Sequence, residues 1–187
     1  MTSHHISKVF MHICGFSGSG KTTLGNTLKT IFGDKIIVQD LDNFLVENYE
    51  LTCTERRQQV EANIKKYIDT LGNDKKIILV GTGCINTVDE EFIDIDVLHR
   101  IWLDVSAAQS SRQGILRQLE WMYNNKEEIV DGMVSSNLED VNDYLNAYCN
   151  YHTRILHWNP LYNVCKNRKY RDITEKDIID IVRNSLK

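Results

Sequence analysis

The residues best suited to chemistry form a glycine-rich run near the start of the chain. Residues 15–22 are Gly-Phe-Ser-Gly-Ser-Gly-Lys-Thr and match the pattern Gly-x-x-x-x-Gly-Lys-Thr at every defined position. Phosphate oxygens need several donors at close range, and glycines let the backbone turn successive N–H groups toward one point. The run therefore predicts a phosphate-binding loop for a nucleoside triphosphate. The alternative is a glycine-rich turn that matches the pattern by chance.

Side chains and backbone groups of this loop have different expected tasks. Lys21 should reach the β- and γ-phosphates, and the Thr22 hydroxyl should bind Mg²⁺. The helix that follows adds its positive N-terminal end. We therefore expect ATP and Mg²⁺ to bind here, with the preference for ATP over GTP left open. The expected nucleotide-binding residues are Gly15, Ser17, Gly18, Ser19, Gly20, Lys21, Thr22 and Thr23.

An alternation of apolar strands and amphipathic helices is expected to position the loop. The expected strands are residues 9–14, 35–39, 77–80, 100–105 and 170–173. Helical spacing is found in residues 22–32 and 55–71, again near Ile115, and after Thr174, whose expected capping partner is Asp177. Such alternation is typical of a parallel sheet covered on both faces. We predict one domain, residues 1–187, with a three-layer α/β/α P-loop NTPase fold and a five-stranded parallel sheet, its strand order left open.

Composition narrows the class of protein. Apolar residues make up 42% of the chain and charged residues 26%, which is typical of a soluble globular domain. The net charge of −4 argues against a nucleic-acid partner, and no stretch approaches the roughly 18–20 apolar residues that span a bilayer. The five cysteines are odd in number and widely spaced, so we expect reduced thiols and a cytoplasmic location. The oligomeric state stays open.

Four features, in chain order, resemble the small-molecule kinases of the adenylate-kinase-like (nucleoside monophosphate kinase) class, and the shikimate and gluconate kinases in particular. They are the phosphate loop, Asp40-Leu41-Asp42 after the second strand, Gly81-Thr82-Gly83 after the third, and Asn159-Pro160-Leu161-Tyr162 near the end of the chain. The resemblance spans most of the chain, and the phosphate loop is its only highly specific part. It implies a kinase that acts on a small molecule.

The resemblance also implies roles for the two carboxylates. Asp40 is expected to face the metal or its waters, and Asp42 to accept hydrogen bonds from a substrate hydroxyl. The placement suits these roles, because ligands of open α/β sheets bind at the carboxyl ends of the strands. A carboxylate there can orient a hydroxyl and take its proton during phosphoryl transfer. The alternative is that the pair only caps a solvent-exposed loop.

Departures from the family pattern leave the phosphoryl acceptor open. Thr82 interrupts the glycine run that the resemblance places against the substrate. Trp158 stands where the family often has a substrate-binding arginine, and Arg154 is a nearby substitute. Arg57 lies near the place of another anion-binding arginine, although an exposed helix face is an equal alternative. The candidate acceptor-binding residues are Asp42, Arg57, Gly81, Thr82, Gly83 and Arg154.

Kinases of this class close a lid over the phosphates, and residues 110–137 are the expected place for it. Arg112 and Arg117 follow the fourth strand, where a lid would begin. An arginine there would stabilise charge on the transferring phosphoryl group, and we favour Arg117 over Arg112. The expected catalytic residues are then Lys21, Asp40, Asp42 and Arg117. The alternative is a surface helix with ordinary solvated arginines.

The expected function is therefore an ATP-dependent phosphotransferase that acts on a hydroxyl of a small molecule. A nucleoside or nucleotide kinase is the nearest rival, because it shares the fold and the loop. A nucleotide-binding regulatory protein with only slow ATP hydrolysis is a second rival. A polynucleotide 5′-kinase is a third, and the acidic net charge argues against it.

Overall fold

The structure of the protein, a computed structural model, describes residues 8–45, 51–72, 74–82, 92–93, 95–125 and 159–187. The chain divides into two compact units. The first unit comprises Met1–Gly15, Gly20–Asp104 and Pro160–Lys187, and the second comprises Phe16–Ser19 and Val105–Asn159. The sheet belongs to the first unit.

The sheet has five parallel strands, as the sequence predicts. They are β1 (Val9–Cys14), β2 (Ile36–Asp40), β3 (Lys76–Val80), β4 (Val97–Leu103) and β5 (Arg171–Ile173). Their order is β2-β3-β1-β4-β5, so β1 is central and hydrogen-bonds to β3 and β4. Because β3 separates β1 from β2, the carboxyl end of β3 lies between the start of the phosphate loop and the Asp40–Asp42 turn.

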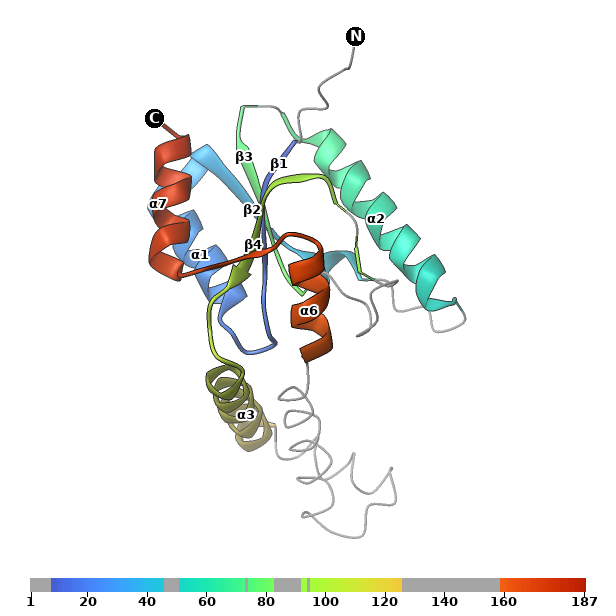
Figure 1. The fold of residues 1–187 in the computed structure, drawn as a ribbon, viewed down its shortest axis with the longest axis vertical. Coiled ribbons are helices and arrows are strands. Elements are labelled where there is room, and N and C mark those ends of the chain that lie inside the picture. The colour runs from blue at the N-terminus through green and yellow to red at the C-terminus, as the bar shows by residue number, and fades with distance from the viewer. Residues whose placement is uncertain (1–7, 46–50, 73, 83–91, 94, 126–158) are drawn as a thin grey trace. The chain divides into compact units, whose positions relative to one another are not determined.

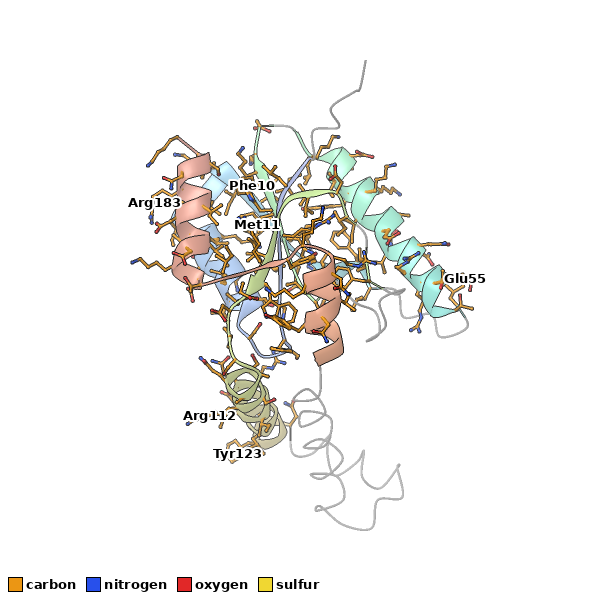
Figure 2. The ribbon with its side chains drawn as sticks, viewed as in Figure 1. Phe10, Met11, Glu55, Arg112, Tyr123 and Arg183 are labelled. Carbon is orange, nitrogen blue, oxygen red and sulfur yellow. The ribbon has the colours of Figure 1, made fainter. Side chains whose placement is uncertain are left out.

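Helices cover both faces of this sheet and make three layers. The helices of the first unit are α1 (Lys21–Phe32), α2 (Cys53–Thr70), α6 (Asn159–Asn167) and α7 (Glu175–Ser185). Figure 1 shows α1 and α7 on one side of the sheet, and α2 and α6 on the other. Phe10 and Met11 lie within the sheet, whereas Glu55 and Arg183 project from helices at the outside (Figure 2).

The helix ends are encoded locally. The Thr52 hydroxyl accepts a hydrogen bond from the Glu55 N–H at 3.2 Å, and Glu55 accepts one from the Thr52 N–H at 2.8 Å, which is a capping box at the start of α2. The Thr174 hydroxyl accepts from the Asp177 N–H at 3.3 Å, which confirms the predicted cap of α7. These bonds satisfy N–H groups that have no partner within their own helix.

The core on the α2 side explains the position of that helix. Val60, Ile64 and Ile68 are spaced four residues apart, so they share one face of α2. That face packs on a single buried cluster with residues from β1, β3 and the turn after β2. The cluster comprises Val9, Leu41, Val60, Ile64, Ile68, Ile77, Leu79 and Ile93.

The second unit contains α3 (Ala107–Asn124) together with the phosphate-loop residues Phe16–Ser19. The Ser106 hydroxyl accepts from the Gln109 N–H at 3.2 Å and so caps the start of α3. Arg112 and Tyr123 project from this helix (Figure 2). No helix in the described part of the chain is both long and apolar enough to cross a membrane.

Candidate active site

The start of α1 has the features of an anion site. Gly20 precedes the helix with φ +89°, a conformation that suits glycine. It offers no side chain to cap the helix, and the first turn contains no acidic residue. The positive end of the helix is therefore not countered by a carboxylate of its own first turn. Lys21 Nζ donates to the Gly15 carbonyl at 3.0 Å, so the lysine side chain reaches back to the residue at which the loop begins.

The middle of the loop, in the second unit, requires glycine at position 18 for two reasons. Gly18 has φ +78°, and a Cβ atom there would lie 2.4 Å from the Ser110 carbonyl oxygen of α3. The Ser19 N–H donates to the Phe16 carbonyl at 3.1 Å, which closes the turn. The sequence pattern thus corresponds to a backbone that only glycine fits, as expected of a loop that surrounds phosphate groups.

Thr22 and Asp40 meet at the carboxyl end of β2. Thr22 Oγ1 donates to Asp40 Oδ2 at 2.9 Å, and Asp40 Oδ1 accepts from the Asp42 N–H at 3.1 Å. The backbone bond fixes the carboxylate, so its second oxygen faces the hydroxyl of Thr22, which the sequence predicts to be a metal ligand. Mg²⁺ prefers oxygen ligands and often takes only one or two from the protein beside phosphate groups. This pair of residues fits that requirement.

The turn after β2 brings a second predicted carboxylate to the same place. Leu41 is buried and packs into the core, while Asp42 is exposed beside it. Gly81, at the end of β3, lies against the turn, because a Cβ atom there would be 2.7 Å from Leu41 Cβ. Two features predicted from sequence, the Asp40–Asp42 turn and the first residue of Gly81-Thr82-Gly83, are therefore neighbours. Thr82, partly buried, follows directly.

The remaining predicted residues belong to α2 and α3 or fall outside the described residues. On α2, Arg57 Nε lies 3.7 Å from Glu61 Oε1, and the Arg57 side chain is partly exposed. Arg112 and Arg117 are exposed on α3 of the second unit. Gly83, Arg154 and residues 126–137 of the expected lid fall outside the described residues. The roles of all these groups stay predictions.

His12 is a buried polar side chain beside Gly81 that was not among the residues predicted from the sequence. Its ring is 1% exposed, and its Nε2 and Nδ1 atoms lie 3.2 Å from the Gly81 carbonyl oxygen and 2.5 Å from the Tyr170 hydroxyl. Burial, with smaller contributions from the charges of Arg100 and Lys21, lowers the pKa of His12 to about 4. The ring is therefore neutral near pH 7. The signal in the sequence is a single polar ring within the otherwise apolar run 9–14, just before the loop.

Comparisons with known proteins give distant structural neighbours. The sequence matches no protein-family model, and it matches no curated protein. A gluconokinase from Sinorhizobium meliloti 1021 is similar with a TM-score of 0.38 and 11% identity, over 87% of this chain and 96% of that one. An uncharacterized protein from Eubacterium ventriosum ATCC 27560 gives a TM-score of 0.40 and 12% identity, over 96% of this chain and 98% of that one. Likenesses at this level identify no function for this chain.

Proposed function

We propose that the protein is an ATP-dependent phosphotransferase that moves the γ-phosphoryl group to a hydroxyl of a small molecule. The observation that supports this best is the hydrogen bond from Thr22 Oγ1 to Asp40 Oδ2, at 2.9 Å. It joins the hydroxyl of the phosphate loop to a carboxylate at the carboxyl end of β2. Such a pair can hold a metal ion or its waters beside a triphosphate.

The nucleotide side of the proposal uses residues 15–23. Backbone N–H groups of the loop and the start of α1 would bind phosphate oxygens, and Lys21 would move from the Gly15 carbonyl to the β- and γ-phosphates. Mg²⁺, when bound at Thr22 and Asp40, would neutralise phosphate charge during transfer. We propose a cytoplasmic location, where thiols stay reduced, because Cys14 and Cys165 form no disulfide.

The acceptor side uses the turn after β2 and the end of β3. Asp42 would orient the acceptor hydroxyl and take its proton, while Gly81 and Thr82 would lie against the acceptor. Arg57, and Arg154 outside the described residues, are candidates to bind an anionic group of the acceptor. Arg117 is the candidate to stabilise charge on the moving phosphoryl group. The acceptor classes that we consider are sugar acids, polyols and nucleosides.

The test is ATP consumption with Mg²⁺ against a panel of sugar acids, polyols, shikimate, nucleosides and nucleoside monophosphates. Lys21→Ala serves as the control, because it removes the cation of the loop. Acceptor-dependent ADP release that disappears in Lys21→Ala would support the proposal and name the acceptor class. Stimulation by nucleosides or monophosphates alone would favour the nucleoside or nucleotide kinase. ATP binding without stimulation by any acceptor would favour the regulatory protein.

A further inference from the structure

Strand β1 holds the two residues that follow β3. The Gly81 N–H donates to the Ile13 carbonyl at 3.1 Å, and the Gly81 carbonyl lies 3.2 Å from His12 Nε2. The Cys14 thiol donates to the Thr82 carbonyl at 2.9 Å. Three consecutive residues of the strand that leads into the phosphate loop therefore fix the Gly81–Thr82 backbone.

The His12 ring supplies a donor where the strand ladder ends. The register of β1 with β3 ends at Ile13 and Val80, and Gly81 leaves the strand with φ +152°. Gly81 is buried, so its carbonyl oxygen needs a partner other than water. A carbonyl can only accept, and the neutral ring must then carry its proton on Nε2. His12 thus satisfies a buried acceptor that would otherwise cost free energy.

Tyr170 fixes this tautomer of the His12 ring through the other ring nitrogen, Nδ1. With the proton on Nε2, Nδ1 must accept, so the Tyr170 hydroxyl donates to it at 2.5 Å. Tyr170 is itself held at the end of α6, where its N–H donates to the Cys165 carbonyl at 2.9 Å. The Phe92 ring packs against Tyr170, with centroids 5.8 Å apart. His12 therefore has one orientation and one tautomer, as a positioning group requires.

The position of Gly81 matters for the carboxylate turn as well. Gly81 lies against Leu41, the residue between Asp40 and Asp42. A Cβ atom at Gly81 would lie 2.7 Å from Leu41 Cβ, so the Gly81 backbone and the Leu41 side chain are in close contact, and a shift of Gly81 toward Leu41 would need that side chain to move. The His12 hydrogen bond therefore influences both Gly81–Thr82 and the turn that presents Asp42.

We propose that His12, held by Tyr170, is a positioning residue for the phosphoryl acceptor. It fixes the Gly81–Thr82 backbone, against which the acceptor would lie, from a buried position on β1. The inference rests on the proposed function, since it assumes that an acceptor binds at the ends of β2 and β3. It predicts that changes at His12 lower kcat/KM for the acceptor and leave the binding of MgATP nearly unchanged.

Three variants test this role. His12→Leu fills the buried space with an apolar side chain and has no donor for the Gly81 carbonyl. His12→Gln can place its amide nitrogen near the position of Nε2 and so restore the donor. Tyr170→Phe removes only the hydroxyl that orients the ring. For each variant we would measure kcat, the KM of the best acceptor from the panel, the dissociation constant of MgATP and the melting temperature.

We expect His12→Leu to lower kcat/KM for the acceptor by about tenfold or more, because small misplacements of a binding group have effects of this size. The dissociation constant of MgATP should stay nearly unchanged, and His12→Gln should recover most of the loss. Tyr170→Phe should fall between His12→Leu and the wild type. Should His12→Leu fail to fold, the comparison of Tyr170→Phe with His12→Gln provides the same test.

The opposite outcomes are equally clear. Parallel losses of ATP binding, acceptor use and melting temperature would show a purely structural role and overturn the inference. Unchanged kinetics in all variants would overturn it too. A wild-type protein that binds ATP but uses no acceptor refutes the proposed function and this inference together. That failure appears in the wild type, whereas failure of the His12 role alone appears only in the variants.

Discussion

Asp40 uses its two oxygens for different purposes. Oδ1 accepts from the backbone N–H of Asp42, and Oδ2 accepts from the Thr22 hydroxyl. The first bond shapes the turn and needs only an acceptor. The second places negative charge beside the phosphate loop, which is the property that a cation requires. A substitution can therefore separate shape from charge at this residue.

We predict that Asp40→Asn folds normally but loses the metal-dependent reaction. The Asn carbonyl can still accept from the Asp42 N–H, while the charge beside Thr22 disappears. Acceptor-dependent turnover should fall by roughly 10²-fold, and more Mg²⁺ should be needed for half-maximal rate. The measurement is turnover against Mg²⁺ concentration. Asp40→Ala is a second variant, which also loses the hydrogen bond from the Asp42 N–H and with it about 1 kcal/mol of stability. A Mg²⁺ dependence equal to that of the wild type would remove Asp40 from the metal site.

Asp42→Asn should lower the rate of phosphoryl transfer without weakening the binding of MgATP. Asp42 is exposed beside the buried Leu41, so the change leaves the core intact. An amide cannot take a proton from the acceptor hydroxyl, and loss of a general base costs about 10²–10⁴-fold in rate. We expect that fall in kcat together with a nearly unchanged dissociation constant for MgATP, measured by calorimetry. Wild-type turnover in this variant would exclude Asp42 from the mechanism.

At the residue scale, local patterns could be predicted and distant partners could not. The conformations of Gly18 and Gly20 follow from a short motif whose residues shape their own backbone. His12 and Tyr170 are 158 residues apart in the sequence, and neither has a neighbour along the chain that indicates the other. Their pairing depends on the strand order, which local periodicity does not contain.

At the scale of elements, strands were predicted best where they are wholly apolar. The first strand, Val9–Cys14, agrees with its predicted bounds. The fourth begins at Val97, earlier than the predicted start at residue 100, because Val97 and His99 pair with β1 although Leu98 between them is exposed. Backbone pairing with the central strand extends β4 through residues that an apolar pattern does not mark.

The end of α6 stores backbone strain at Lys169. This residue has φ +65° and is the only non-glycine with positive φ among the described residues. Its N–H donates to the Lys166 carbonyl at 3.0 Å, and the next N–H, of Tyr170, donates to Cys165, as in the helix ending that usually employs glycine. The strained residue thus turns the chain so that Tyr170 reaches His12.

We predict that Lys169→Gly stabilises the protein by about 0.5–1 kcal/mol, because glycine adopts this conformation without a steric cost. The gain should appear as a higher urea midpoint with an unchanged slope. Lys169→Ala is the matched control, since it removes the same side chain but keeps the strain, and it should give no gain. A less stable Lys169→Gly would mean that the lysine side chain contributes more than its backbone strain costs.

At the scale of the whole molecule, the α/β class could be predicted from the alternation of apolar strands and amphipathic helices along the sequence. The order of the strands in the sheet could not. The order β2-β3-β1-β4-β5 places the loop after the central strand and the end of β3 between β1 and β2. That arrangement depends on pairing between segments far apart in sequence. It is what makes Gly81 a neighbour of both His12 and Leu41.

The buried neutral His12 should make global stability sensitive to mild acid. Its pKa is lowered from 6.5 to about 4 in the folded chain, chiefly by burial. Above about pH 6.5 the ring is neutral in both states, but at lower pH the unfolded chain binds a proton that the folded chain does not. The free energy of unfolding should therefore fall as pH drops toward 4, by about 2 kcal/mol at pH 5 from this residue alone. Urea unfolding near pH 7.5 and pH 5 should show a loss that is larger in the wild type than in His12→Gln by that amount, because glutamine cannot titrate. His99, whose pKa is lowered chiefly by burial, acts in the same direction in both proteins and cancels in the comparison. An equal pH dependence in the two proteins would mean that His12 accepts its proton in the folded state. That outcome would contradict the buried environment of His12 between the Gly81 carbonyl and the Tyr170 hydroxyl.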